Sequence, residues 1–212
     1  TTMSLSKGTW NGANTGKLNA TLTNGTSWTG DSSGAGSMIK LDASTWSGMN
    51  SGANTNVTLT NGASWSKGNT ADGVTVKADK AAWTGANGGA KSNITLSNSA
   101  SWNGANTGSN ATVNLTDSSW SGDNSGAGLS LTANNSKWNG NANAAGSATL
   151  TNGSSWTGAS TSADFALTLN GSTWNNSGAS SLKSFTGTNG IVDMTNAAAS
   201  VTIGSYSGDA TV

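Results

Sequence analysis

The sequence contains no Cys, His, Glu, Gln, Arg or Pro, and these absences exclude several classes of function before any motif is considered. Without His and Cys, the chain cannot build a Ser-His-Asp triad, a Cys-His pair or a zinc site with His or Cys ligands. General-base catalysis would depend on Asp or Lys alone. Without Arg, and with nine Lys balanced by nine Asp, the chain lacks the basic surface typical of nucleic-acid binding. We therefore expect a protein that is not an enzyme and has no cofactor, metal site or nucleic-acid partner.

Long apolar runs are also missing. No segment approaches the ~20 apolar residues that a membrane-spanning helix requires. The chain begins Thr-Thr-Met-Ser, without the basic and apolar stretches of a signal peptide, so we expect a mature fragment of a larger protein. Most of the 212 residues are Ser, Thr, Asn, Gly and Ala, and only 8% are charged. Disordered chains combine low hydrophobicity with high net charge and few aromatic residues, whereas this chain is neutral and rich in Trp.

The tryptophans recur at a nearly constant spacing of 18 or 19 residues, and there is no Trp outside this series. The ten residues are Trp10, Trp28, Trp46, Trp65, Trp83, Trp102, Trp120, Trp138, Trp156 and Trp174. Self-similarity at a fixed period of about 20 residues is typical of a solenoid, in which equivalent coils stack into one elongated body.

Each coil contains two segments that are typical of β-strands. A pair of apolar residues separated by one residue precedes each Trp from the second onwards, which is the period-2 pattern of a strand with one buried face. The pairs are Ala20/Leu22, Ile39/Leu41, Val57/Leu59, Val74/Val76, Ile94/Leu96, Val113/Leu115, Leu129/Leu131, Ala148/Leu150 and Leu167/Leu169. The Trp itself lies in a second short strand, and corners such as Asn24-Gly25 supply the positive φ of a tight turn. No apolar stripe of helical period is present.

We expect the Trp side chains to point inward. With Trp outside, each coil would bury only two aliphatic side chains, too few to offset an ordering entropy of roughly 1–2 kcal/mol per residue. An inward Trp buries roughly 150–250 Å² and adds on the order of 4–6 kcal/mol per coil before costs. The alternative is an exposed Trp ladder that stacks on sugars. The sequence therefore predicts an all-β, single-stranded β-solenoid with about 18-residue coils: ten coils over residues 1–178 and atypical C-terminal coils, which act as a cap, over residues 179–212.

The handedness follows less directly from the pattern. A coil of 18 residues also fits three hexads, the repeat of a left-handed β-helix, and Leu22, Trp28 and Gly34 lie six apart. However, the spacing from aliphatic residue to Trp slips to five at Leu41 and to seven at Leu131, and a Trp in every coil would overfill a hexad prism. We favour a right-handed parallel β-helix.

Inward Trp and aliphatic residues leave Ser, Thr and Asn on the outside. One predicted outer row contains Thr21, Lys40, Thr58, Thr75, Thr95, Asn114, Ser130, Thr149 and Thr168. A second contains Ser27, Thr45, Ser64, Ala82, Ser101, Ser119, Lys137, Ser155 and Thr173. The threonines of the first row form our candidate binding face: Thr21, Thr58, Thr75, Thr95, Thr149 and Thr168.

The end of the chain resembles a known family. After Trp174 come Ser181-Leu182-Lys183-Ser184-Phe185, then Gly190-Ile191-Val192-Asp193-Met194, then Val201-Thr202-Ile203 before a Gly-containing turn. This order is similar to the C-terminal part of pertactin-like autotransporter passengers, and the upstream Ser-Trp-Thr-Gly and Leu-Thr-Asn-Gly units resemble the coils of that family. The resemblance implies a right-handed β-helix adhesin on the surface of a Gram-negative cell or secreted from it, linked to its own outer-membrane β-barrel beyond Val212. Exported repeat proteins of this kind often avoid Cys.

The resemblance and the repetitive surface together favour adhesion or self-association. The partner would be a host surface protein, a glycan or another copy of the chain, and the outer hydroxyls are candidates for glycosylation. The first alternative is ice binding, because Thr-x-Thr pairs such as Thr21/Thr23 and Thr149/Thr151 suit a water-ordering face, although Lys40 interrupts the row. The second is a polysaccharide-acting β-helix enzyme, which needs clustered acids. Here the aspartates are scattered over the coils, and although Asp117 and Asp123 lie in one coil, solvated turn carboxylates explain them better.

Overall fold

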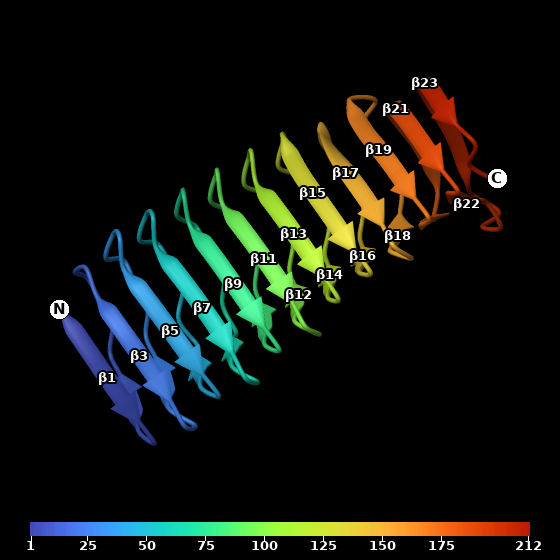
Figure 1. Cartoon of the computed structure of the whole chain (residues 1–212). Coiled ribbons are helices and arrows are strands. Elements are labelled where there is room, and N and C mark those ends of the chain that lie inside the picture. The colour runs from blue at the N-terminus through green and yellow to red at the C-terminus, as the bar shows by residue number, and fades with distance from the viewer.

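The computed structural model describes all residues from 1 to 212 and contains strands and turns but no helix. About twelve coils stack into a straight rod with the two termini at opposite ends (Figure 1). Every strand pairs in parallel with the equivalent strand of the next coil, so the chain builds one 12-stranded sheet (the large sheet) and one 11-stranded sheet (the small sheet). The predicted all-β parallel solenoid is confirmed, and its right-handedness stays a prediction.

The large sheet is built from the longer strand of each coil: β1 (Thr2–Ser6), β3 (Asn19–Thr23), β5 (Met38–Asp42), β7 (Asn56–Thr60), β9 (Thr75–Asp79), β11 (Asn93–Ser97), β13 (Thr112–Thr116), β15 (Leu129–Asn134), β17 (Gly146–Thr151), β19 (Phe165–Asn170), β21 (Ala179–Thr188) and β23 (Ser200–Gly208). The small sheet is built from the strands that carry Trp and their C-terminal successor: β2 (Thr9–Asn11), β4 (Ser27–Thr29), β6 (Thr45–Trp46), β8 (Ser64–Trp65), β10 (Ala82–Thr84), β12 (Ser101–Asn103), β14 (Ser119–Ser121), β16 (Lys137–Asn139), β18 (Ser155–Gly158), β20 (Thr173–Asn176) and β22 (Ile191–Asp193).

The strands of the large sheet alternate between buried and outward residues, as the period-2 pattern predicts. Two of the predicted pairs are wrong by two residues. Val76 and Ala78, not Val74 and Val76, lie in register with Ile94 and Leu96 of the next coil. Likewise Leu131 and Ala133, not Leu129 and Leu131, lie in register with Val113 and Leu115. In both coils an extra apolar residue precedes the strand pair and Ala fills the last inward position, so the apolar pattern alone leaves two registers open.

The corner between the two sheets occurs in a short and a long form. In the long form two consecutive residues adopt positive φ, as in Asn24 (56°) and Gly25 (79°). In the short form a single residue does so, as in Ala43 (46°). The predicted role of Asn and Gly is confirmed, since these residues tolerate the left-handed region best. The two corner forms differ in length by one residue. This difference compensates for the variation in coil length, so the strands on either side stay in register.

The Trp residues form a continuous stacked ladder inside the rod. Neighbouring rings lie 4.3 to 5.1 Å apart between centroids and within 10° of parallel. The inward orientation is confirmed: nine of the ten are at most 1% exposed, and only Trp10, in the first coil, is partly exposed. Each indole N–H from Trp28 onwards donates to the carbonyl two residues after the preceding Trp, as from Trp102 to Gly85 at 2.8 Å.

A second ladder of Asn side chains runs along the third side of the coil and was not predicted. Its members follow their Trp by four residues: Asn50, Asn69, Asn87, Asn106 and Asn124, all at most 1% exposed. The Nδ2 of each of the first four donates to the Oδ1 of the next Asn at 2.7 to 2.9 Å. All five also donate to the carbonyl two residues ahead in their own coil. The ladder thereby satisfies these buried amides, which would otherwise destabilise the fold, with the exception of the Oδ1 of Asn50.

Residues 179–212 continue both sheets instead of folding back over the last coil. β21 and β23 extend the large sheet, and β22 extends the small sheet with Val192 in register with Trp174. Because Val replaces Trp at this place, the C-terminal end contains a pocket of about 350 Å³. Its lining is entirely apolar: Trp174, Phe185, Val192, Met194, Val201, Ile203, Tyr206 and Val212.

Candidate binding face

The outward residues of the large sheet form three parallel rows that run the length of the rod. The first row contains Thr2, Asn19, Met38, Asn56, Thr75, Asn93, Thr112, Ser130, Ser147, Ala166, Ser184 and Ser205. The middle row contains Ser4, Thr21, Lys40, Thr58, Lys77, Thr95, Asn114, Thr132, Thr149, Thr168, Thr186 and Ser207. The third, here called the corner row, contains Ser6, Thr23, Asp42, Thr60, Asp79, Ser97, Thr116, Asn134, Thr151, Asn170 and Thr188.

Five of the six threonines that we predicted as a binding face share the middle row. They are Thr21, Thr58, Thr95, Thr149 and Thr168. Thr75 also points outward but lies in the first row, beside Asn56 and Asn93.

The predicted outer row contains the same two-residue error as the core pairs. Lys77, not Thr75, lies between Thr58 and Thr95. In the same way Thr132 occupies the middle-row place that we had given to Ser130. A count back from the following Trp with the short corner would have placed both residues correctly.

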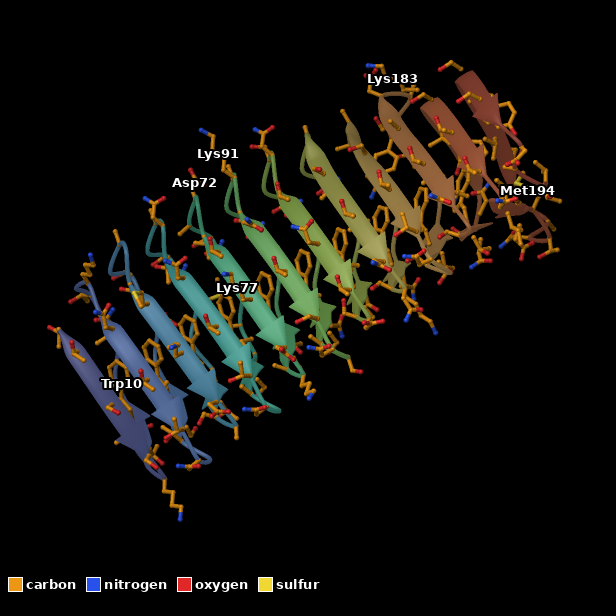
Figure 2. All side chains as sticks on the ribbon, viewed as in Figure 1. Trp10, Asp72, Lys77, Lys91, Lys183 and Met194 are labelled. Carbon is orange, nitrogen blue, oxygen red and sulfur yellow. The ribbon has the colours of Figure 1, made fainter.

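Charge in the three rows is confined to four residues in two coils, and one further lysine of the large sheet, the exposed Lys183 in β21, lies outside the rows. Lys40 and Asp42 lie in β5, and Lys77 and Asp79 lie in β9 two coils further on. In both strands the lysine is in the middle row and the aspartate is in the corner row. Figure 2 shows Lys77 over the broad face of the sheet, whereas Asp72 and Lys91 lie along one edge of the rod.

Both carboxylates are held by asparagine amides of the following coil. Asn61 donates its Nδ2 to Asp42 at 2.6 Å, and Asn98 donates to both carboxylate oxygens of Asp79 at 3.1 Å. The two lysines are exposed. The face therefore presents fixed negative groups beside flexible positive ones.

The C-terminal half of the three rows is free of charge. From β13 to β21 the three rows consist of Thr, Ser, Asn and one Ala. Within the middle row four consecutive coils contribute Thr132, Thr149, Thr168 and Thr186. The result is a lattice of hydroxyl and methyl groups with the coil spacing of about 4.8 Å in one direction.

The other aspartates act mainly as acceptors at the corners. Asp31, Asp72 and Asp123 each accept a backbone N–H from the following coil at 2.7 or 2.8 Å. Asp117 accepts the Nδ2 of Asn135 at 2.6 Å. We singled out Asp123 together with Asp117 because both lie in one coil. Their carboxylates accept hydrogen bonds from different partners, a backbone N–H for Asp123 and an Asn side chain for Asp117. No group of three or more acidic, His or Cys residues is placed to hold a metal ion.

The outward rows of the small sheet are narrower. The predicted second row is confirmed by the register, which aligns Ser27, Thr45, Ser64, Ala82, Ser101, Ser119, Lys137, Ser155 and Thr173. The strands here contain only two to four residues, against five to ten in the large sheet. The large sheet is therefore the broadest continuous surface of the molecule.

Comparison of the chain with family models, curated proteins and solved structures finds no match. The chain contains no helix with the length and apolar character needed to cross a membrane.

Proposed function

We propose that this chain is a surface-displayed passenger domain of the autotransporter type that acts in adhesion or self-association through the outer face of its large sheet. The single observation that carries the proposal is the face itself. Three rows of mostly short polar side chains repeat over the whole rod. The bacterial cell surface, and linkage to an outer-membrane β-barrel beyond Val212, are part of the same proposal and depend on the sequence resemblance.

A repetitive face binds by the addition of many weak contacts. Each hydroxyl or amide contributes a net hydrogen bond of only ~0.5–1.5 kcal/mol. Useful affinity therefore requires several coils to bind together, at the effective concentration that a rigid spacing provides. Ser, Thr and Asn have few rotatable bonds, so little side-chain entropy is lost when they become ordered.

The test is adhesion of cells that display rods of different length. Deletion of residues 94–112 joins Asn93 to Val113, which is the register equivalent of Ile94, so one coil is removed without a break in either ladder of strands. Deletion of residues 94–130 removes two coils in the same way. We expect clumping or surface attachment to decrease step by step with coil number. Complete loss after one point substitution in a folded rod would indicate a discrete site instead.

Ice binding is a second candidate, and one observation favours it. In the C-terminal half of the rows, threonine occupies four consecutive coils of the middle row, with Thr151 and Thr188 beside Thr149 and Thr186. Thermal hysteresis of the purified rod tests this candidate. If hysteresis is measurable and is abolished by Thr168→Lys, whereas Thr58→Lys at the charged half has no effect, ice binding replaces adhesion as the proposed function.

A further inference from the structure

The four charged residues of the three rows have a fixed order. In β5 and again in β9, lysine lies in the middle row and aspartate in the corner row, two residues later in the same strand. The remaining paired positions in the three rows are uncharged. A partner that fits this face must therefore match two lysine–aspartate pairs of the same orientation, two coils apart.

A second copy of the chain meets this requirement in only one orientation. If two large sheets face each other as parallel rods, a two-fold axis along the rods brings the middle row of one copy opposite the corner row of the other. Lys40 then lies opposite Asp42 of the second copy, and Lys77 lies opposite Asp79, which gives four complementary contacts. If the rods are antiparallel and fully overlapped, middle row faces middle row, so Lys40 lies opposite Thr168 and Lys77 lies opposite Thr132, and no charged pair forms.

The same charges also fix how far the rods slide along each other. Without an offset all four charged pairs are complementary. An offset of two coils keeps only half of them, and an offset of one coil places every charge opposite a hydroxyl of Thr58 or Thr60 or their neighbours. Along the rest of the face Thr and Asn oppose Thr and Asn, and the coil spacing matches because both copies are the same chain.

The pairing overlaps the middle and corner rows, which span about three residues of each strand. Twelve strands at ~4.8 Å spacing then give on the order of 500–600 Å² for each copy. The total of about 1,000 Å² meets the lower limit of a specific protein interface.

We propose that two copies of this chain pair as parallel rods through the outer faces of their large sheets, with Lys40 and Lys77 of each copy opposite Asp42 and Asp79 of the other. The inference deepens the proposed function and rests on self-association, one of its two proposed activities. The hydroxyl and amide rows supply the contact area, and the four charged pairs select the orientation and the register, which is the usual role of interfacial charge. The amides of Asn61 and Asn98 already orient the two carboxylates.

Charge reversal provides a matched test in solution. The variant K40D/K77D has only negative charge in the three rows, and D42K/D79K has only positive charge. We expect the wild-type chain to sediment as a dimer and each variant alone to sediment as a monomer. A one-to-one mixture should restore the dimer, because all four contacts become complementary again. The control K67D/K137D changes two lysines outside the three rows and should leave the wild-type dimer intact. Circular dichroism and Trp emission confirm that each variant is folded.

The orientation is tested by cross-linking. The chain has no cysteine, so each substitution introduces a single thiol. Thr21 and Thr23 lie in the middle and corner rows of one coil, and the parallel pair brings them opposite each other. We expect an oxidised mixture of T21C and T23C to form the mixed disulfide, and a mixture of T21C and T186C to form none. Preferential T21C–T186C product would overturn the parallel arrangement.

Three results would overturn the inference: a monomeric wild-type chain, dimeric charge variants, or a mixture of variants that stays monomeric. The clumping and attachment of cells that display the chain test the proposed function separately. If wild-type and both charge variants clump cells equally, the parallel pairing is wrong and the proposed function stands. If the wild-type dimer forms in solution but no cell clumps or attaches, the proposed function fails and the pairing stands.

Discussion

The indole N–H of Trp102 donates a hydrogen bond of 2.8 Å to the carbonyl oxygen of Gly85 in the preceding coil. The ring also stacks on Trp83 and Trp120, at 4.9 and 4.7 Å between centroids. A central Trp therefore joins three coils, through two ring faces and one polar atom. Because the same arrangement recurs from coil to coil, the tryptophans hold the coils together along the whole rod.

Replacement of Trp102 by alanine should lower the free energy of unfolding by roughly 3–5 kcal/mol, because it leaves a large cavity and removes two stacked faces. Trp10→Ala should cost clearly less, since Trp10 is partly exposed and stacks only on Trp28. Urea unfolding followed by circular dichroism measures both. Equal losses for the two variants would contradict a ladder whose strength comes from two-sided stacking.

Replacement of Ser32 by asparagine should stabilise the protein by roughly 0.5–1.5 kcal/mol, the value of one net hydrogen bond. The Oδ1 of Asn50 is buried without a donor, and Ser32 occupies the preceding place in the ladder. An amide there would donate to Asn50 and still accept from Asn14, which now donates to the Ser32 hydroxyl at 3.1 Å. The melting temperature is the measurement, with Ser33→Asn on the exposed neighbour as the control. A lower melting temperature for Ser32→Asn would show that the site has no room for the amide.

Replacement of Gly104 by alanine should destabilise the fold by about 3 kcal/mol or more, because the new methyl group overlaps backbone. A Cβ at this position would lie 2.0 Å from the carbonyl oxygen of Gly85. Gly16→Ala is the matched control, since a Cβ there meets nothing within 4 Å. We expect the control to stay within about 0.5 kcal/mol of wild type. Similar unfolding midpoints for the two variants would mean that the coils move apart easily.

Replacement of Ala43 by glycine should raise stability, against the usual direction of this change. Ala43 forms the short corner at a φ of 46°, where a residue with a Cβ is strained by roughly 1–2 kcal/mol. Relief of this strain exceeds the entropy cost of glycine, ~0.4–1 kcal/mol, by a small margin. Ala13→Gly, at an exposed position without positive φ, should lower stability instead. Opposite signs in chemical denaturation are the expected result, and a loss in both variants would count against corner strain.

The carboxyl of Asp193 should titrate below its ordinary range. The backbone N–H of Thr195 donates to its Oδ1 at 2.8 Å, and this bond, with a smaller contribution from the Thr195 hydroxyl, lowers the pKa of Asp193. A lowered pKa stabilises the folded chain above the unfolded-state value, and this contribution is lost as the pH falls through the folded-state pKa. NMR titration of the side-chain carboxyl should give a midpoint below that of an exposed Asp in the same spectrum. A midpoint at or above that reference would show that the bond does not persist in solution.

The sequence was sufficient to predict the coil, because its apolar residues recur with two periods at once. Alternation within each strand and the 18 or 19 residue spacing of Trp together predict stacked parallel strands, and the small aliphatic core of each coil favours Trp inside. The register in β9 and β15 could not be read in the same way, because Val74 and Leu129 extend the apolar run by one place. There the corner length, not hydrophobicity, decides which residues point inward.

The candidate face was predictable in its chemistry but not in its charge pattern. Five of the six chosen threonines lie in one row, yet the misplaced register put Thr75 where Lys77 belongs. Only the correct register places Lys77 in the middle row and Asp79 in the corner row, which are the rows of Lys40 and Asp42. The Asn ladder had a readable signal in the sequence, since Asn follows Trp by four residues in six coils. Nothing in composition indicates that these amides are buried.

The Asn ladder gives the rod an electrical direction. In every contact from Asn50 to Asn124 the N–H points toward the C-terminal end and the oxygen toward the N-terminal end. Aligned amide dipoles polarise one another, so each bond is strengthened by its neighbours in a medium of low dielectric constant. The unpartnered oxygen of Asn50 is the negative terminus of this column. A break at Asn87 would therefore leave two short dipoles in place of one long one, and the loss would exceed that of a break at either end.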